Sequence, residues 1–220
     1  MRGVGVGGRR SPWSGAIALG ATMVVGAWLV QDGSGPGLPP SPSAAEAPAA
    51  GPARAALSGT PLAASAPTRI GIPSIGVDAP VAGLGLDPDG HLATPSDQDR
   101  NLAGWYRAGV TPGQSGTALM VGHVDTAAGP AVFYGLGSLH RGDRIDVSRR
   151  DGGTAYFVVD ALEVYAKTAF PDRQVYGRAA DPQLRLITCG GAFAKGRGYQ
   201  GNLVVYAHLV GSRRPGWGRP

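Results

Sequence analysis

The sequence has one cysteine, only four scattered histidines and no cluster of acidic residues. A single thiol, Cys189, cannot form an intramolecular disulfide, which excludes a small disulfide-stapled scaffold. An unpaired thiol outside the cell is open to oxidation, and this favours a chemical role for it. The histidines show no metal-ligand spacing, and the scattered acidic residues indicate no calcium site. We therefore expect neither a metal nor a cofactor.

The central part of the chain also lacks an excess of charge of either sign. Residues 67–210 contain 13 Lys and Arg and 13 Asp and Glu, so the formal net charge of +5 arises entirely outside them. A nucleic-acid-binding protein is expected to carry its basic residues on the folded domain. We therefore expect no nucleic-acid partner, and we interpret the basic ends as membrane flanks and a tail.

The N-terminal segment has the pattern of a membrane anchor. Residues 11–31 carry no charge, and a helix of about 20 residues spans a bilayer core of roughly 30 Å. Arg2, Arg9 and Arg10 precede the segment and Asp32 follows it. The positive-inside rule then places the N-terminus in the cytoplasm and the rest outside. Residues 1–31 are predicted to be a cytoplasmic stub with a signal anchor, and the alternative is a cleaved signal peptide.

The remaining chain divides by composition into a linker, a domain and a tail. Of the 37 glycines and 19 prolines, many fall in residues 32–66, which are rich in Pro, Ala and Gly. Such a segment buries too little apolar surface to offset its ordering entropy, so we expect a disordered tether. Residues 67–210 are predicted to form a folded domain and residues 211–220 a flexible tail.

The domain shows an all-β pattern, in which short β-type runs recur between turns. Apolar residues between 130 and 139 have the spacing of one short helix. Strand and helix segments do not alternate, so a closed or nearly closed β-barrel is favoured over a parallel α/β sheet. The strands are expected at 69–72, 77–81, 117–122, 144–147, 155–165, 184–188 and 203–209.

The most informative local run is Leu-Ile-Thr-Cys-Gly-Gly at residues 186–191. We expect an apolar strand to end on Thr188 and Cys189 and to break at the two glycines, where the backbone can approach a ligand closely. A thiol in this place is a candidate nucleophile. The alternative is a buried structural cysteine that closes a strand, since free cysteine is among the most buried residue types.

Two further residues could complete a thiol-based site. His123 follows a predicted strand and Gly122, and an imidazole there can activate a thiol or donate a proton to a leaving amine. A lone histidine is otherwise more often structural. Arg197 lies between Cys189 and the last strand, and a chain reversal there could bring its guanidinium to the oxyanion of an intermediate. The alternative is a solvated loop arginine.

Several motifs together resemble the sortase family, and the resemblance is close to its class F (actinobacterial) members. It extends over about residues 69–209. The run before Gly190 resembles the family's Thr-Leu-X-Thr-Cys signature, and residues 122–125 (Gly-His-Val-Asp) look like its histidine segment. Further matching segments occur in the same order at 70–77, 104–106, 129–134 and 202–207.

The resemblance implies an eight-stranded sortase-type β-barrel with one or two short helices and a Cys-His-Arg site. Such an enzyme cleaves a Leu-Pro-X-Thr-Gly-type sorting signal between Thr and Gly. Cys189 would form the thioacyl intermediate, His123 would transfer protons, and Thr188 would help to line the substrate groove. The implied partners are surface proteins that bear the signal, a peptidoglycan precursor or other amine acceptor, and the membrane. We expect a monomer without a cofactor.

One departure from the family pattern concerns the arginine. Many relatives have Tyr-Arg-Asp-Asn before the last strand, where this chain has Gln200 after Tyr199. Arg197 is the nearest substitute and Arg185 is the fallback.

The loop of residues 167–183 is expected to form an apolar wall for the substrate. Its candidate substrate-binding residues are Phe170, Val175 and Tyr176. The alternative is a loop that its own aromatic residues hold in place.

Two other functions remain open on the sequence. An L,D-transpeptidase-like acyl-transferase of peptidoglycan also uses Cys and His, but its motif brings them close together in the sequence, whereas His123 and Cys189 lie far apart. A non-catalytic tethered binding domain is supported only by the missing arginine beside Tyr199.

Overall fold

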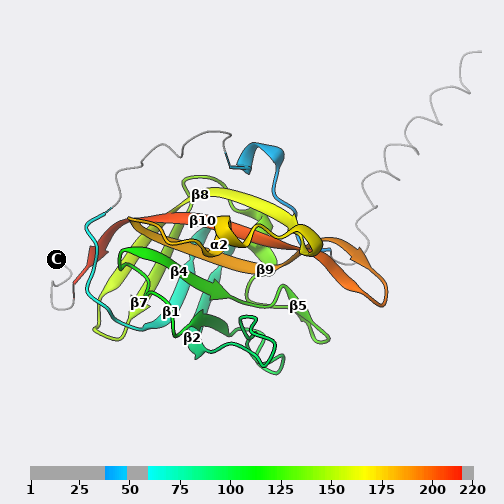
Figure 1. Ribbon diagram of the computed structural model, residues 1–220, viewed down its shortest axis with the longest axis horizontal. Coiled ribbons are helices and arrows are strands. Elements are labelled where there is room, and N and C mark those ends of the chain that lie inside the picture. The colour runs from blue at the N-terminus through cyan, green and yellow to red at the C-terminus, as the bar shows by residue number, and fades with distance from the viewer. Residues whose placement is uncertain (1–37, 49–58, 215–220) are drawn as a thin grey trace, which may run out of the picture. The chain divides into compact units, whose positions relative to one another are not determined.

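A computed structural model of the chain describes residues 38–48 and 59–214 (Figure 1). The predicted stub and signal anchor, residues 1–31, lie outside the described residues. Among the helices that are described, none is both long and apolar enough to cross a bilayer. All contacts reported below lie within the unit formed by residues 39–220.

Eight strands close into a barrel in the order β1-β2-β3-β4-β9-β10-β8-β7. The pairs β2–β3 and β4–β9 are parallel, and the other neighbours are antiparallel. The all-β eight-stranded barrel expected from the sequence is thus confirmed. The barrel strands are β1 (Pro67–Ile72), β2 (Val77–Leu84), β3 (Ala103–Tyr106), β4 (Gly116–Val121), β7 (Arg144–Arg149), β8 (Thr154–Ala166), β9 (Pro182–Ala194) and β10 (Gly198–Arg213).

The remaining elements are short. Two-residue strands β5 (Asp125–Thr126) and β6 (Gly129–Pro130) form a separate ribbon after β4. The helix expected between 130 and 139 is a five-residue 3₁₀ turn, η3 (Tyr134–Ser138). The other helical turns are η1 (Ala44–Glu46), η2 (Pro73–Ile75), η4 (Lys167–Ala169) and α2 (Asp172–Tyr176).

Strand β9 is buried on both faces between Leu184 and Thr188, a stretch that is apolar at three of its five positions. Successive side chains of a strand point to opposite faces. Leu184 and Leu186 therefore enter the barrel core, while Ile187 joins a second cluster on the outside with Val175 of α2. The connection from β8 to β9, which contains η4 and α2, covers this outer cluster (Figure 1).

The hairpin of β9 and β10 is longer than the sequence predicts. The expected break after Cys189 is wrong, because β9 continues through both glycines to Ala194. Gly190 pairs with Gly201 of β10, so the ladder supports the glycines from the neighbouring strand. Strand β10 also continues to Arg213, three residues into the expected tail. Figure 1 shows the tip of this hairpin projecting beyond the other strands.

Candidate functional site

The parallel pairing of β4 and β9 brings two distant segments together at one end of the barrel. The last pair of this ladder is Val121 with Ile187, and the Gly122 N–H donates to the Ile187 carbonyl at 3.2 Å. The buried Thr188 hydroxyl donates to the Gly122 carbonyl at 2.8 Å. His123 and Cys189 are the next residues of the two segments. The backbone therefore places them at the same end of neighbouring strands.

Glycine at position 122 is required by close packing. A Cβ atom there would lie 2.6 Å from Val132 Cγ1 and 2.7 Å from Phe133 Cδ2, well inside van der Waals contact. The Phe133 N–H also donates to the His123 carbonyl at 3.0 Å. The segment before η3 thus packs directly on the turn that carries His123.

Cys189 is half-buried in a pocket just beyond the point where the pairing of β9 with β4 ends. This position does not fit a structural cysteine enclosed in the core. The Lys167 ammonium is a polar neighbour of the thiol, with Nζ 3.9 Å from Sγ. Apolar side chains and a segment from the N-terminal region line the same pocket, namely Val124, Phe133, Tyr134, Val164, Leu203 and Pro39–Pro42.

The His123 ring is 19% exposed and is held by the segment of residues 95–97. Its Nε2 atom lies 2.8 Å from the Pro95 carbonyl oxygen and 2.9 Å from Asp97 Oδ1. Both oxygens are acceptors, so Nε2 carries a hydrogen and Nδ1 is the nitrogen left for proton transfer. These bonds direct Nε2 toward residues 95–97 and not toward the thiol.

Tyr199 joins the hairpin to the His123 segment. Its buried phenol donates a 2.5 Å hydrogen bond to Asp125 Oδ2, two residues after His123. Phe193 packs on its ring with a centroid distance of 5.1 Å. Burial raises the pKa of Tyr199, and the hydrogen bond to Asp125 raises it further, so the phenol stays a donor. This bond fixes the segment that carries His123 relative to the hairpin that carries Cys189.

Lys167 is a residue of the site that the sequence analysis missed, since it was treated only as the start of a loop. In the barrel, Ala166 of β8 pairs with Gly201 of β10, and Gly201 pairs with Gly190 of β9. Lys167 therefore emerges two strands away from Cys189. The one signal of this residue in the sequence was the rarity of lysine, because the chain has only one other, Lys195.

The two candidate arginines do not reach the thiol within the described part of the chain. Arg197 is exposed in the turn between β9 and β10, where its N–H donates to the Ala194 carbonyl at 2.9 Å. The Gln200 side chain donates to the carbonyls of Gly198 and Arg197. An arginine in the site remains a prediction.

Arg185 is buried on the outside of the barrel. Its guanidinium lies 4.4 Å from the centroid of the Tyr206 ring, and its Nε has no hydrogen-bond partner. Burial lowers its pKa to about 10. It lies four positions before Cys189, or about 13 Å along β9.

The predicted substrate-binding residues occupy two different places. Thr188 lines the pocket beside Cys189. Val175 is fully buried in the outer cluster, and Phe170 packs at its edge between Tyr165 and Tyr176. Tyr176 is 43% exposed. Val175 thus supports the loop from behind, and contact of Phe170 and Tyr176 with a substrate remains a prediction.

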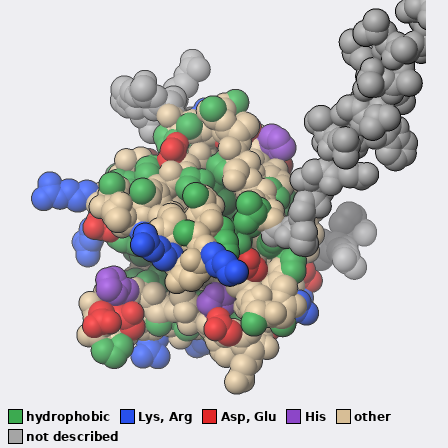
Figure 2. Space-filling model, turned by 90° about the vertical axis from the view of Figure 1, so that its right-hand side faces the viewer, with side chains coloured by type: hydrophobic (Ala, Val, Ile, Leu, Met, Phe, Trp, Pro, Cys, Tyr) green, Lys and Arg blue, Asp and Glu red, His purple; other side chains and the backbone are tan. Residues whose placement is uncertain are grey.

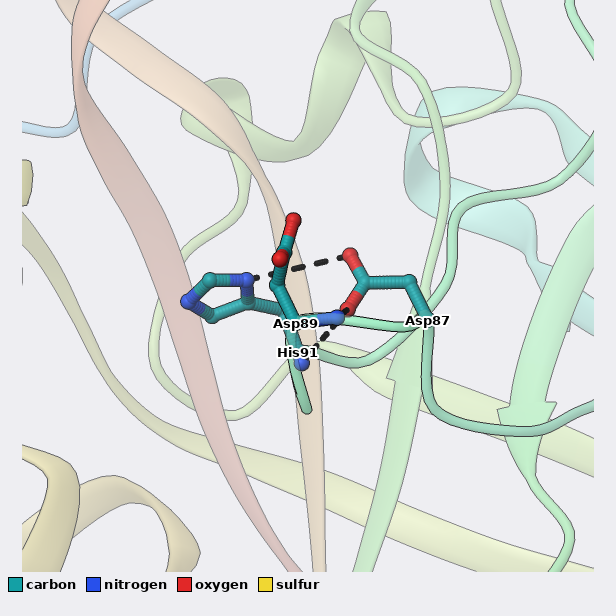
Figure 3. Close-up of side chains that lie close together, drawn as sticks. All are labelled: Asp87, Asp89 and His91. Atoms are coloured by element: carbon teal, nitrogen blue, oxygen red, sulfur yellow. Dashed lines mark hydrogen bonds and ion pairs between the residues drawn. The ribbon is translucent and has the colours of Figure 1, made fainter.

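Asp87, Asp89 and His91 form a small exposed cluster whose ligand-capable atoms lie within 4.8 Å of one another (Figure 3). Asp87 Oδ1 already accepts the N–H groups of Asp89 at 3.0 Å and His91 at 2.8 Å. This is the hydrogen-bonding pattern of an Asp-stabilised turn. The turn accounts for the cluster, and we assign no metal to it.

Charged side chains do not form a large patch of one sign on the face that carries the hairpin. Figure 2 shows Lys and Arg, Asp and Glu, and His side chains scattered among apolar ones on this face. The surface shown on this face therefore carries basic, acidic and apolar side chains together.

Comparisons with known proteins agree with this geometry. The sequence matches a family model described as a sortase domain over residues 70–210. The fold is similar to that of Listeria monocytogenes sortase A, with 16% identity, a TM-score of 0.52 and coverage of 68% of this chain and 90% of that one. No curated protein matches the sequence significantly.

Two further solved structures show the same fold. Sortase C-1 from Actinomyces oris is 24% identical, with a TM-score of 0.51 and coverage of 64% of this chain and 72% of that one. Sortase C1 of Streptococcus agalactiae, in a complex with MTSET, is 18% identical, with a TM-score of 0.52 and coverage of 66% and 70%. The family model covers more than half of the chain, so this chain belongs to the sortase family of cysteine transpeptidases.

Proposed function

We propose that this sortase cleaves a Leu-Pro-X-Thr-Gly-type signal and joins the released protein to an amine acceptor of the cell wall. The observation that carries the proposal is the half-buried thiol of Cys189 in a pocket where the β4–β9 ladder ends, next to the segment that carries His123. Within the family, the motifs favour class F.

The first half-reaction acylates the enzyme. The Cys189 thiolate attacks the Thr carbonyl carbon, and a C–S bond forms while the carbonyl becomes an oxyanion. The C–N bond to Gly then breaks, and His123 gives a proton to the leaving amine. The products are a thioester on Cys189 and a C-terminal fragment that begins with Gly.

The second half-reaction returns the enzyme to its starting state. The acceptor amine attacks the thioester carbonyl and loses a proton to His123. The C–S bond breaks, and the thiolate leaves as the new amide bond is complete. No oxidant or cofactor is consumed, because one amide bond replaces another.

Lys167 supplies the positive charge that we expected from an arginine. Its ammonium lies 3.9 Å from Sγ, close enough to stabilise the thiolate and the neighbouring oxyanion. Lysine acts here as a point charge and cannot make the bidentate contacts of a guanidinium.

The cellular setting of the proposal follows from the N-terminal sequence. Residues 1–31 would anchor the enzyme in the membrane with the catalytic domain outside, where surface proteins and peptidoglycan precursors are available. The enzyme would act as a monomer.

The test is turnover of a quenched Leu-Pro-X-Thr-Gly peptide with an added amine. We expect cleavage between Thr and Gly, transfer to the amine, and a thioacyl adduct on Cys189 detected by mass spectrometry. Cys189→Ala should remove both activities, a loss of at least about a thousandfold. An unchanged melting temperature of this variant would show that the loss is chemical.

Other outcomes would favour the alternatives. Turnover of peptidoglycan stem peptides without turnover of the sorting peptide would favour the L,D-transpeptidase-like function. A folded protein that forms no acyl adduct with either peptide would favour a binding domain.

A further inference from the structure

The residue that lies directly across the sheet from Cys189 is Asn202. In the antiparallel ladder of β9 and β10, Asn202 pairs with Cys189, and the register continues without a shift from Gly201 to His208. Residues paired in this way carry their side chains on the same face of the sheet, with Cβ atoms about 4.5–5.5 Å apart. The register of the ladder therefore places a carboxamide beside the thiol.

Asn202 and Cys189 share the outer face of the barrel. Two positions further along the ladder, Val204 pairs with Ile187, and both belong to the outer cluster. Because side chains alternate along a strand, residues two positions apart point to the same face. The loop of residues 167–183, in which contact with a substrate is predicted, packs on the same cluster. A carbonyl group that the thiol attacks on this face therefore lies next to the Asn202 side chain.

The Asn202 carboxamide is available to a ligand. Asn202 is half-buried, and its side chain forms no hydrogen bond with any residue that the structure describes. Its neighbour in β8, Tyr165, is already engaged, because the Tyr165 hydroxyl lies 2.9 Å from the Tyr206 hydroxyl and accepts from the Gln174 amide at 3.0 Å. In this row of the sheet, the two amide N–H donors of Asn202 are therefore the ones left unused.

The proposed chemistry requires a donor at this place. When a thiolate adds to a carbonyl carbon, the carbonyl oxygen becomes an oxyanion, which positioned hydrogen-bond donors stabilise. Lys167 contributes a positive charge 3.9 Å from Sγ, but an ammonium on a flexible stem is a point charge without a fixed direction. A short carboxamide on a paired strand has few rotamers and offers an N–H donor with a defined direction.

We propose that Asn202 is a catalytic residue whose carboxamide N–H donates a hydrogen bond to the oxyanion of each tetrahedral intermediate. It takes the role that the sequence assigns to an arginine, with Lys167 adding the charge. The amide keeps its proton throughout. The electron pair of the oxyanion re-forms the carbonyl as the C–N bond to the leaving amine breaks and, in the second half-reaction, as the C–S bond breaks. The inference rests on acyl transfer by Cys189, as proposed above, but not on the identity of the peptide.

Loss of this donor should affect the rate of reaction and not the binding of substrate. Removal of one oxyanion donor costs about 10²–10³ in kcat in enzymes of this kind. The hydrogen bond strengthens only as charge develops on the oxygen, so KM should change little. A side chain that merely shaped the groove would instead raise KM.

The experiment uses the full chain with two variants and a matched control. Asn202→Ala removes the carboxamide. Asn202→Asp keeps its shape but, as a carboxylate, has no donor. The control is Gln200→Ala, which removes another carboxamide of β10, one that donates to the carbonyls of Arg197 and Gly198. Melting temperatures report whether each variant is folded.

Three rates are measured on each protein. The first is steady-state turnover of the quenched sorting peptide with an added amine. The second is acylation of Cys189 by p-nitrophenyl acetate, which forms an oxyanion but needs no sorting signal. The third is alkylation of Cys189 by iodoacetamide, which forms a C–S bond without an oxyanion. Since Cys189 is the only cysteine, mass spectrometry assigns both modifications to this site.

Both Asn202 variants should lower kcat by about a hundredfold or more with KM within a few-fold of wild type, and both should slow acylation by the ester. Alkylation should stay at the wild-type rate, and Gln200→Ala should resemble wild type in all three measurements. Should Asn202→Ala fail to fold, Asn202→Asp decides alone, because it keeps the shape of the side chain.

A kcat near that of wild type in the folded variants would overturn the inference. An equal fall in acylation and alkylation would also overturn it, because the side chain would then act on the thiol or on the shape of the site. Slower ester acylation in the variants, with no peptide turnover by wild type, would support Asn202 and contradict the proposed function. Peptide turnover that is unchanged in the variants would support the function and contradict the role of Asn202.

Discussion

The end of the β4–β9 ladder and the tip of the β9–β10 hairpin differ in how firmly they hold their side chains. At the strand ends, Thr188 bonds to the Gly122 carbonyl and the His123 ring is held by two oxygens. At the hairpin tip, Arg197 is exposed and only its backbone makes a turn contact. Positions set by the sheet are suited to precise chemistry, and positions on a projecting turn are not.

The largest effect should come from the strand ends. His123→Ala is expected to lower kcat/KM for the sorting peptide by about 10²–10⁴-fold, because proton transfer to the leaving amine is lost. The measurement is steady-state peptide cleavage, with the melting temperature as the control for folding. Activity within a few-fold of wild type would remove His123 from the mechanism.

A comparison of cations should separate the pocket from the hairpin tip. Lys167→Ala is expected to lower kcat by roughly ten- to a hundredfold, because one charge that stabilises the thiolate and oxyanion is removed. Lys167→Arg should recover part of the rate. The matched control is Lys195→Ala, an exposed lysine of the hairpin turn.

Arg197→Ala sharpens the same comparison. We expect its rate to stay close to wild type, because the side chain is exposed and does not contact the thiol among the described residues. If Arg197→Ala lowers kcat more than Lys167→Ala, the assignment of the site's cation is reversed.

Packing at the strand ends can be tested through stability. Gly122→Ala forces a Cβ to 2.6 Å from Val132, and overpacking of this kind costs about 1–3 kcal/mol of unfolding free energy. Denaturant unfolding measures the change. Gly71→Ala is the control, since its added Cβ would have no neighbour closer than 3.9 Å. Equal stability of the two variants would show that the turn that carries His123 accepts an added methyl group at position 122.

A smaller change in stability should come from the bond that joins the two regions. Tyr199→Phe removes the donor to Asp125 and is expected to cost about 1 kcal/mol of unfolding free energy. It should also lower kcat by a few-fold, because the His123 segment loses a support. A fall in stability without any change in kcat would show that this bond stabilises the hairpin but does not position His123.

The sequence predicts the barrel well wherever a strand has enough residues to show its pattern. Strand β3 was missed because its four residues are too few to show a strand pattern. It is defined by its pairing with two neighbours, parallel with β2 and antiparallel with β4. The break expected after Cys189 was wrong because a glycine pair can be supported from the neighbouring strand, and a local reading cannot show this.

The residues of the candidate site also differ in how well the sequence predicts them. Cys189 and His123 stand out in the sequence because each follows or precedes glycine at the end of an apolar run. Lys167 does not, because its approach to the thiol depends on the order of β8, β10 and β9 around the barrel. The contacts of residues 39–48 with the barrel were not predicted, because a proline-rich composition indicates a tether and says nothing of contacts such as that of Glu46 with Arg141.

The parallel ladder between β4 and β9 has a consequence for the maturing chain. It joins residues more than sixty positions apart, so it can form only late, after intervening segments have folded. Until then the segment that carries Cys189 is not joined to the segment that carries His123, because the Gly122–Ile187 hydrogen bond belongs to this pairing. The proposed site is therefore assembled only after both of these segments have been made and paired.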